Sequence, residues 1–245
     1  MRIDVFLTER GLAASRTEAK GLIQAGAVSV GGKKITKPSY DITDSDVASV
    51  VVDRSLKKYV SRGGLKLEGA LSVFSVDASG KLCIDVGAST GGFTDCLLQN
   101  GASSVIAVDS GTSQLSQSLR DDGRVISIEN YNARYLSRAD MPFVPELAVM
   151  DVSFISATYI IKPLFDALAE GADFICLIKP QFEVGREHIG KGGIVKSAAM
   201  REAALSKVCE YAKSVGFDFL GSIVSPIEGG DGNVEYLAHF KKKRE

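Results

Sequence analysis

Short apolar runs recur along the chain from residue 82 onward, and helical patterns separate most of them. The runs cover residues 82–86, 104–109, 125–129, 147–152, 173–178, 220–224 and 234–240. Runs of this length are typical of buried strands. In the stretch 198–215, apolar residues recur at helical spacing and predict a buried stripe of Met200, Ala204, Val208, Tyr211 and Val215. The alternation predicts an α/β fold with a doubly wound parallel sheet.

The last two runs are expected to behave differently from the rest. The turn-rich sequence SPIEGGDGN joins them, at residues 225–233. Such a short, turn-forming connection favours an antiparallel hairpin at the end of the sheet. We therefore expect seven strands, with the final hairpin antiparallel.

The first 53 residues carry a different pattern, with two short helical patterns and a hairpin. Ser15 and Glu18 fit the capping box S/T-x-x-E, which predicts that a helix begins here, and Gly26 is placed to end it. Residues 28–30 and 33–35 then read as two strands around a Gly-Gly turn. We predict a small domain over residues 1–53.

A connecting segment follows this domain. The sequence RSLKKYVSRGG, residues 54–64, is predicted to be a linker that ends in a glycine hinge. Beyond it, Leu67, Ala70, Leu71 and Phe74 have helical spacing and predict a helix that packs on the main domain. The main domain is expected to cover residues 65–245.

The charge of the chain is unevenly distributed. The 245 residues have a formal net charge of -1, yet residues 1–68 contain 12 Lys and Arg against 8 Asp and Glu, and the remainder contains 17 against 22. A basic small unit joined to an acidic larger one indicates a nucleic-acid anchor. The candidate RNA-binding residues, expected to gather on one face, are Arg16, Lys20, Lys33, Lys34 and Lys37.

Composition excludes several other classes. The chain is 45% hydrophobic and 24% charged, and no apolar run approaches the roughly 18 residues of a membrane-spanning helix. The first residues lack the apolar core of a secretory signal, so the expected location is cytoplasmic. The four cysteines, Cys83, Cys96, Cys176 and Cys209, have no metal-ligand spacing and are expected to be buried free thiols. No metal and no membrane partner are expected, and the oligomeric state is unknown.

The sequence IDVGASTGGFTDC, residues 84–96, is the strongest chemical signal. An apolar run ends at Asp85, the chain turns through Gly87, Gly91 and Gly92, and a helical pattern begins. Glycine allows a backbone to pass close to a ligand, and the free N–H groups of a helix start favour negative charge. In a dinucleotide fingerprint the second glycine approaches the pyrophosphate, and Ser89 takes that place here. A dehydrogenase is therefore disfavoured.

Two more residues extend this candidate cofactor site. Asp109 ends the next apolar run, where such folds place a carboxylate for ribose hydroxyls. Asn132 follows the third run, at the position that often lies near an adenine, although it could equally cap a helix. The spacing Asp85-x-Gly87-x-Ser89-x-Gly91 resembles motif I of class I methyltransferases, D-x-G-x-G-x-G, and this resemblance implies S-adenosylmethionine as the cofactor.

The N-terminal sequence also resembles a known family. SRTEAKGLIQAGAVSVGGKKITKPSYDITDSD, residues 15–46, is similar to the small αL-motif RNA-binding domain of ribosomal small-subunit protein four and of many RNA-modifying enzymes. The chain departs from that family at Gly31, where asparagine is more usual, but glycine also suits a turn. The resemblance implies an RNA-binding role for residues 1–53.

Four polar residues are placed to carry chemistry. Asp151 and Lys179 stand at the ends of apolar runs, Glu235 begins the last run, and Lys66 lies on the helix after the glycines. Together they resemble the Lys-Asp-Lys-Glu tetrad of FtsJ-like ribose 2′-O-methyltransferases. The phrases YVSRGGLKLEGAL, DVGASTGGFTD, DVSFIS, KPQFEVG and GNVEYLA resemble the TlyA (haemolysin A) family of ribosomal RNA methyltransferases over essentially the whole chain.

This resemblance implies an activity. The chain would transfer a methyl group from S-adenosylmethionine to a cytidine ribose of small- or large-subunit ribosomal RNA, as free RNA or in subunits. Lys179 would be the central lysine, oriented by Asp151, while Glu235 would steer Lys66 or the ribose. A lysine acts as a base only where a positive neighbour or burial lowers its pKa, and a carboxylate neighbour opposes that change. Positioning of the hydroxyl is therefore the firmer role.

Other readings stay open at this stage. Taken singly, Lys66 could be solvated, Asp151 could cap the segment after it, and Glu235 could be an edge-strand charge. The glycine-rich basic loop 184–196 is predicted to be either a mobile lid that contacts RNA or a plain surface loop. A base N-methyltransferase is disfavoured, because residues 151–154 lack the prolines of its aromatic clamp. A cytolysin and a non-catalytic RNA-binding protein are the alternatives from other classes.

Overall fold

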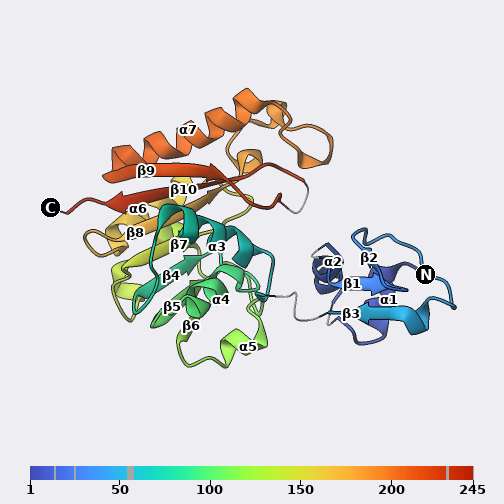
Figure 1. The fold of residues 1–245 in the computed structure, drawn as a ribbon. Coiled ribbons are helices and arrows are strands. Elements are labelled where there is room, and N and C mark those ends of the chain that lie inside the picture. The colour runs from blue at the N-terminus through green and yellow to red at the C-terminus, as the bar shows by residue number, and fades with distance from the viewer. Residues whose placement is uncertain (14, 25, 54–57, 230–231, 245) are drawn as a thin grey trace. The chain divides into compact units, whose positions relative to one another are not determined.

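The computed structural model describes residues 1–13, 15–24, 26–53, 58–229 and 232–244. The chain forms two compact units, residues 1–62 and 63–245. They are drawn in blue and in green to red, respectively (Figure 1). The predicted linker 54–64 falls partly on residues 54–57, which lie outside the described residues. The two glycines that were predicted to form a hinge instead open the first helix of the second unit, Gly63–Phe74.

The first unit packs two helices against a small antiparallel sheet. Its helices are α1 (Ile3–Glu9) and α2 (Arg16–Gln24), and its sheet has the order β2 (Lys33–Ile35), β1 (Val28–Val30), β3 (Val50–Val52). A short 3-10 turn, η1 (Val47–Ser49), leads into β3. The sequence analysis did not predict β3. The buried core includes Ile3, Leu7, Ile23 and Val28.

The local signals in this unit act as the sequence predicts. The Ser15 hydroxyl accepts a hydrogen bond from the Glu18 backbone N–H at 3.2 Å and so caps α2. Gly26 has a φ of +71°, which ends the helix in the left-handed region. Gly31 and Gly32 both have positive φ, as a two-residue hairpin turn requires. The predicted helix start and hairpin are confirmed.

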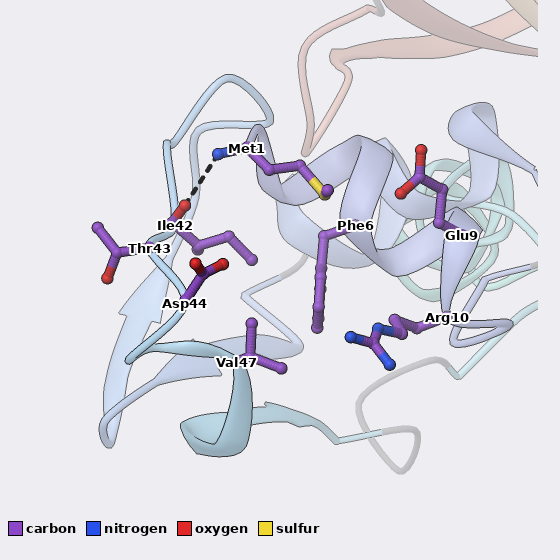
Figure 2. A pocket seen from close by; sticks show the side chains of 8 residues that line it. All are labelled: Met1, Phe6, Glu9, Arg10, Ile42, Thr43, Asp44 and Val47. Atoms are coloured by element: carbon purple, nitrogen blue, oxygen red, sulfur yellow. Dashed lines mark hydrogen bonds between the residues drawn. The ribbon is translucent and has the colours of Figure 1, made fainter.

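A pocket of about 340 Å³ opens in this unit (Figure 2). It is lined by Met1, Phe6, Glu9, Arg10, Ile42, Thr43, Asp44 and Val47. The N-terminal amine closes one side by donating to the carbonyl of Ile42 at 2.9 Å. None of these lining residues belongs to the predicted sites.

The second unit contains a seven-stranded sheet with helices on both faces. The strands are β4 (Leu82–Val86), β5 (Ser104–Val108), β6 (Val125–Ile128), β7 (Leu147–Met150), β8 (Asp173–Ile178), β9 (Phe217–Val224) and β10 (Tyr236–Lys242). The helices are α3 (Gly63–Phe74), α4 (Gly92–Gln99), α5 (Gln117–Arg120), α6 (Thr158–Ala167) and α7 (Ala198–Val215). The 3-10 turns are η3 (Ala133–Tyr135), η4 (Arg138–Asp140), η5 (Pro180–Phe182), η6 (Arg186–His188) and η7 (Lys191–Gly193).

The strand order is β6-β5-β4-β7-β8-β10-β9. The first five strands in this order are parallel, and β10 runs antiparallel to both β8 and β9. The doubly wound fold and the antiparallel final hairpin are thereby confirmed. Strand β9 begins at Phe217, three residues earlier than predicted. After β4 the chain adds β5 and β6 on one side of it, and then β7 and β8 on the other side. This reversal of strand order is a topological switch point, and folds of this kind bind ligands at the carboxyl ends of the two strands that flank it, here β4 and β7.

Helices α6 and α7 cover one face of this sheet, with Ile161, Leu164 and Val208 in its largest buried cluster. On α7 the predicted stripe is partly wrong, because Tyr211 is 37% exposed. Ala204 and Val208 are buried as predicted, and Met200 and Val215 are half-buried. Cys209 and Ala212 complete the buried face. Ala212 faces the sheet in place of Tyr211, since the small side chain lets the helix pack closely.

The amino end of β8 carries a buried charge cluster. Asp173 accepts hydrogen bonds from His239 Nε2 at 3.0 Å, Lys241 Nζ at 3.1 Å and Lys81 Nζ at 3.1 Å. Burial disfavours the charged form of the Asp173 carboxyl and so raises its pKa. The three hydrogen-bond donors favour the charged form more strongly and hold the pKa below its usual value of 3.8. Lys242 and Lys243 also form ion pairs, with Glu170 and Asp218. The basic C-terminal residues therefore serve to anchor β10.

Asp173 gives a pH-dependent contribution to stability. A carboxyl whose pKa falls on folding stabilises the folded state above its unfolded pKa and loses that contribution as pH falls through the folded pKa. We expect Asp173→Asn to lower the melting temperature at pH 7, and the difference from wild type to shrink below about pH 3.8. Thermal unfolding at pH 7, 5, 4 and 3 measures this. A difference that stays constant down to pH 3 would contradict the role given to this carboxylate.

All four cysteines are free and buried, as expected. Over the described residues, no helix is both long and apolar enough to cross a membrane. In the same residues, no group of three or more His, Cys, Asp or Glu is arranged to hold a metal ion.

Candidate active site

The glycine turn after β4 is held by a close approach of two backbones. Gly87 has a φ of +84°, and a Cβ atom there would collide with the carbonyl oxygen of Asp151. Gly91 has a φ of +97°, and a Cβ atom there would collide with Leu119. These positions need glycine for both conformation and space. The turn therefore lies directly against the segment that follows β7.

Ser89 adopts a glycine-like conformation in the same turn, with a φ of +48°. Its backbone N–H donates to Asp109 Oδ2 at 2.8 Å. The other oxygen of Asp109 accepts from the N–H of Gly111 at 2.7 Å. Asp109 therefore joins the turn after β4 to the end of β5, in addition to any ligand that it holds.

Asp85 is fully buried below this turn. Its Oδ2 atom accepts a hydrogen bond from the Thr94 hydroxyl at 2.7 Å, whereas Oδ1 has no hydrogen-bond partner among the described residues. Burial, with a smaller contribution from the nearby carboxylates of Asp151 and Asp109, raises the pKa of Asp85 to about 7, although hydrogen bonds from Thr94 lower it. An unpartnered buried carboxylate oxygen at the switch point favours a ligand that carries a positive charge or a hydrogen-bond donor.

The raised pKa of Asp85 has a measurable consequence. Between an unfolded pKa of 3.8 and a folded pKa of about 7, the folded state binds more protons, so stability falls as pH rises. We expect Asp85→Asn to stabilise the ligand-free protein at pH 8 and to stabilise it by a clearly smaller amount at pH 5, where only the first part of this pH range has been crossed. Thermal unfolding at both pH values tests this. An equal shift in melting temperature at pH 5 and pH 8 would contradict it.

Asn132 caps η3 in the structure. Its side-chain oxygen accepts from the backbone N–H of Arg134 at 3.1 Å. The capping role considered in the sequence analysis is therefore present, and an additional contact with a cofactor stays a prediction.

Two of the four tetrad residues form a buried ion pair. Lys66 on α3 and Glu235, just before β10, are only 8% and 2% exposed. Their Nζ and Oε2 atoms lie 2.5 Å apart. A charged pair removed from water is costly to break, since each charge left alone would stay desolvated. This pair ties α3 to the start of β10.

The other two tetrad residues form a second ion pair. Lys179 Nζ lies 2.5 Å from Asp151 Oδ1 and donates a hydrogen bond to Ser153 Oγ at 2.7 Å. The Oδ1 atom has no partner with hydrogen-bond geometry in the described chain, so its contact with Lys179 is electrostatic. Ser153 was not predicted as a site residue, although it lies two residues after Asp151.

The sheet brings both pairs to one edge. Asp151 follows β7, Lys179 follows β8, and β10 lies next to β8. The register pairs Tyr236 with Ile178, so one further step places Glu235 opposite Lys179. Adjacent strands are about 5 Å apart. The four residues are therefore neighbours at the carboxyl ends of the central parallel strands.

Two further side chains that the sequence analysis missed shape this edge. Phe154 is 91% exposed, has a φ of +64°, and its ring centroid lies 5.1 Å from that of Phe182. Glu183 is buried and accepts from the backbone N–H of Ala157 at 2.7 Å, which fixes the start of α6. Their signal was weak because neither an aromatic residue nor a glutamate in a loop is unusual alone.

The glycine-rich basic loop 184–196 is held near its C-terminal end by Asn233. Asn233 is buried, accepts from the Val195 N–H at 3.0 Å and donates to the Gly193 carbonyl at 3.0 Å. Asn233 lies two residues before Glu235, so the loop and the buried ion pair share one segment. These bonds hold the last residues of the loop, and both the mobile lid and the plain surface loop stay predictions for the rest of it.

The candidate RNA-binding residues of the first unit are all exposed. Lys33 and Lys34 are consecutive residues of β2, so their side chains point to opposite sides of the ribbon and do not share a face. Arg16 is held in place by the buried Asp4, which accepts from its Nη2 atom at 3.0 Å and also pairs with Arg2. Both arginine side chains stay about half exposed.

Comparison with known proteins gives two family matches. The family model of FtsJ-like methyltransferases matches residues 59–242, and that of the S4 domain matches residues 1–47. The chain is 47% identical over 240 residues to "Putative rRNA methyltransferase YqxC" of Bacillus subtilis, covering 98% of this chain and 85% of that protein. It is 43% identical to the 16S/23S rRNA (cytidine-2'-O)-methyltransferase TlyA of Mycobacterium tuberculosis, covering 96% and 88%.

Solved structures agree with these matches. One named "Putative hemolysin from Streptococcus thermophilus" has a TM-score of 0.79 and 44% identity, covering 100% of this chain and 89% of that chain. An S-adenosylmethionine-dependent methyltransferase from Mesorhizobium loti has a TM-score of 0.54 at 14% identity, covering 72% and 98%. The second likeness concerns the fold alone.

Proposed function

This chain belongs to the TlyA family of FtsJ-like methyltransferases, and from that premise we propose that it methylates the ribose 2′-hydroxyl of ribosomal RNA. The observation that carries the proposal is that two ion pairs lie at the carboxyl ends of the central strands. They join Lys66 with Glu235 and Lys179 with Asp151. Asp151, a member of the second pair, lies directly against the glycine turn at Gly87.

We propose S-adenosylmethionine as the cofactor, and the residues of this edge fit it. The unpartnered Asp85 Oδ1 suits a cationic group, and Gly87 lets the turn after β4 pack directly against the backbone of Asp151 beside it. Asp109 would hold ribose hydroxyls, with Ser89, Gly91, Gly92 and Asn132 around the rest of the molecule. When bound, the sulfonium of this cofactor supplies an electrophilic methyl group.

The chain's own residues would prepare the acceptor. A ribose hydroxyl is a weak nucleophile that gains from a positioned group near its proton and from exact alignment. Lys179 would contact that hydroxyl oxygen, while Asp151 and Ser153 fix the direction of its amine. In this account the role of Lys179 is to orient the acceptor hydroxyl. Removal of the hydroxyl proton by Lys179 would be an additional role.

Lys66 and Glu235 would act beside this centre. Their mutual pairing leaves little exposed surface, so their main effect is to fix the edge of the sheet next to Lys179. Glu235 precedes a strand whose register places it across from Lys179, so the pair would steer the ribose through the position of that edge.

We propose that the first unit contributes RNA affinity. Its S4 match and its exposed basic residues, Arg16, Lys20, Lys33, Lys34 and Lys37, fit phosphate contacts. Lysines on both sides of the β2 ribbon would contact different parts of the RNA. The substrate that we propose is a cytidine in small- or large-subunit ribosomal RNA, because a relative bears that activity in its name.

Transfer of label from methyl-tritiated S-adenosylmethionine tests the function. We expect incorporation into ribosomal RNA when unmethylated small or large subunits, or the RNA extracted from them, are supplied. Subunits already modified by the enzyme serve as the matched control and should accept no further label. RNA binding without any transfer would favour a non-catalytic binding protein, and release of haemoglobin from erythrocytes without transfer would favour a cytolysin.

A further inference from the structure

Two tyrosines of the second unit are strongly exposed, although large aromatic side chains are usually at least partly buried. Tyr135 is 75% exposed and Tyr159 is 61% exposed. Tyr135 ends η3, which follows β6, and Tyr159 lies in the first turn of α6, which follows β7. Both segments therefore leave the sheet at its carboxyl edge, where Asp109 and Asp151 also lie. Exposed aromatic residues in such a place indicate a binding surface.

The backbone that carries Tyr135 is fixed. Its carbonyl oxygen accepts from the Tyr131 hydroxyl at 2.8 Å, and its N–H donates to the Asn132 carbonyl at 2.9 Å. The next residue, Leu136, is buried in the core. Because the main chain is already held at both sides, binding a partner here requires no ordering of the backbone, and the ring itself has only two side-chain torsions to fix.

Arg134 links the two segments. Its guanidinium carbon lies 4.9 Å from the centroid of the Tyr159 ring, which is the geometry of a cation–π contact. Helix α6 packs against η3, and the contact between Arg134 and Tyr159 places these two side chains on one surface. Tyr135 is the exposed residue next to Arg134 on η3. We call Arg134, Tyr135 and Tyr159 the stacking surface.

We propose that the stacking surface binds unpaired nucleotides of the RNA that flank the target ribose. This inference rests on the proposed function, since it adds a contact to the same substrate. Every base has a face that stacks on an aromatic ring or a guanidinium plane, and Arg134 also attracts the phosphate backbone. A 2′-hydroxyl that must reach a catalytic edge is most accessible in an unpaired strand. The surface lies outside the tetrad and the cofactor residues.

A tryptophan reporter tests the contact directly. The chain contains no tryptophan, so Tyr159→Trp introduces a single fluorophore into the full-length protein. We expect its emission to be quenched by a single-stranded oligoribonucleotide and to be almost unchanged by a perfectly paired RNA duplex of the same composition. Unchanged emission with the single strand, while that oligonucleotide binds the protein by another assay, would overturn the proposal.

Matched substitutions separate this role from the chemistry. We expect Tyr135→Ala with Tyr159→Ala to raise the Michaelis constant for RNA about tenfold, because loss of stacking weakens binding. The turnover number and the affinity for S-adenosylmethionine should change little, and Tyr159→Phe should keep most of the affinity. Tyr211→Ala, which removes an exposed tyrosine from α7, is the control and should have no effect.

The two proposals fail in different ways. If the wild-type protein transfers no methyl group but the tryptophan reporter is quenched by single-stranded RNA, the proposed function is wrong and the stacking surface stands. If methyl transfer proceeds and the double alanine variant has the wild-type Michaelis constant, the stacking surface is wrong and the function stands.

Discussion

Lys179→Ala is expected to reduce methyl transfer by about 10³-fold, in the range typical of a group that acts on the proton of a reacting hydroxyl. Lys179 directly follows β8 at the carboxyl end of the strand, with its amine held between Asp151 and Ser153. Removal of the amine leaves no cation in that position to orient the acceptor oxygen. The loss should fall on the turnover number, because the cofactor residues after β4 and β5 are untouched.

Two controls make this result specific. Lys162→Ala removes an exposed lysine that pairs with Asp166 on α6 and should leave transfer unchanged. Binding of S-adenosylmethionine to the Lys179→Ala protein, followed by calorimetry, should stay close to wild type. A Lys179→Ala protein that binds the cofactor and still transfers methyl groups at more than a third of the wild-type rate would remove Lys179 from the centre of the site.

Glu235→Gln is expected to destabilise the second unit by about 3–5 kcal/mol, the usual effect of leaving one charge of a buried pair alone. Lys66 would keep its charge in a pocket where it is only 8% exposed. The same substitution should lower methyl transfer, since the segment between Asn233 and β10 is positioned by this pair. Unfolding in urea, followed by circular dichroism, measures the first effect.

A double substitution distinguishes folding from function at this pair. Lys66→Met with Glu235→Gln removes both charges and keeps similar volumes, so it should recover much of the stability that Glu235→Gln loses. It should not recover methyl transfer. If the double variant is as active as wild type, the pair is structural and has no part in the reaction.

Most of the fold was predictable because each element is encoded locally. The strand runs, the capping box at Ser15 and the turn at Gly31 and Gly32 all act through residues close in sequence. Strand β3 was missed because its three residues are marginal without the neighbouring β1. The stripe on α7 was misassigned at Tyr211 because helical spacing allows either that residue or Ala212 to face the sheet. The sheet, which only the folded chain presents, selects Ala212.

Within the candidate site, the four tetrad residues were expected only through the resemblance to a family, whereas the glycine turn and Asp109 were expected from the residue pattern itself. Lys66 and Glu235 are separated by 169 residues, and no spacing rule predicts that they form a buried pair. Ser153, Glu183 and Asn233 were missed because their partners come from other loops. Asn132 differs from these residues because its partner is close in sequence. Its side chain caps the turn that begins one residue later, so the capping role could be predicted from the local sequence.

The chemical position of the transferred methyl group is the most direct test of the central claim. Ribosomal RNA labelled by the wild-type protein would be digested to nucleosides, separated and identified by mass spectrometry, with RNA treated by Lys179→Ala as the comparison. We predict 2′-O-methylcytidine in the wild-type sample and almost none with the variant. A methyl group on a base, or the same ribose label with the variant, would contradict the assignment of this edge as a ribose methylation site centred on Lys179.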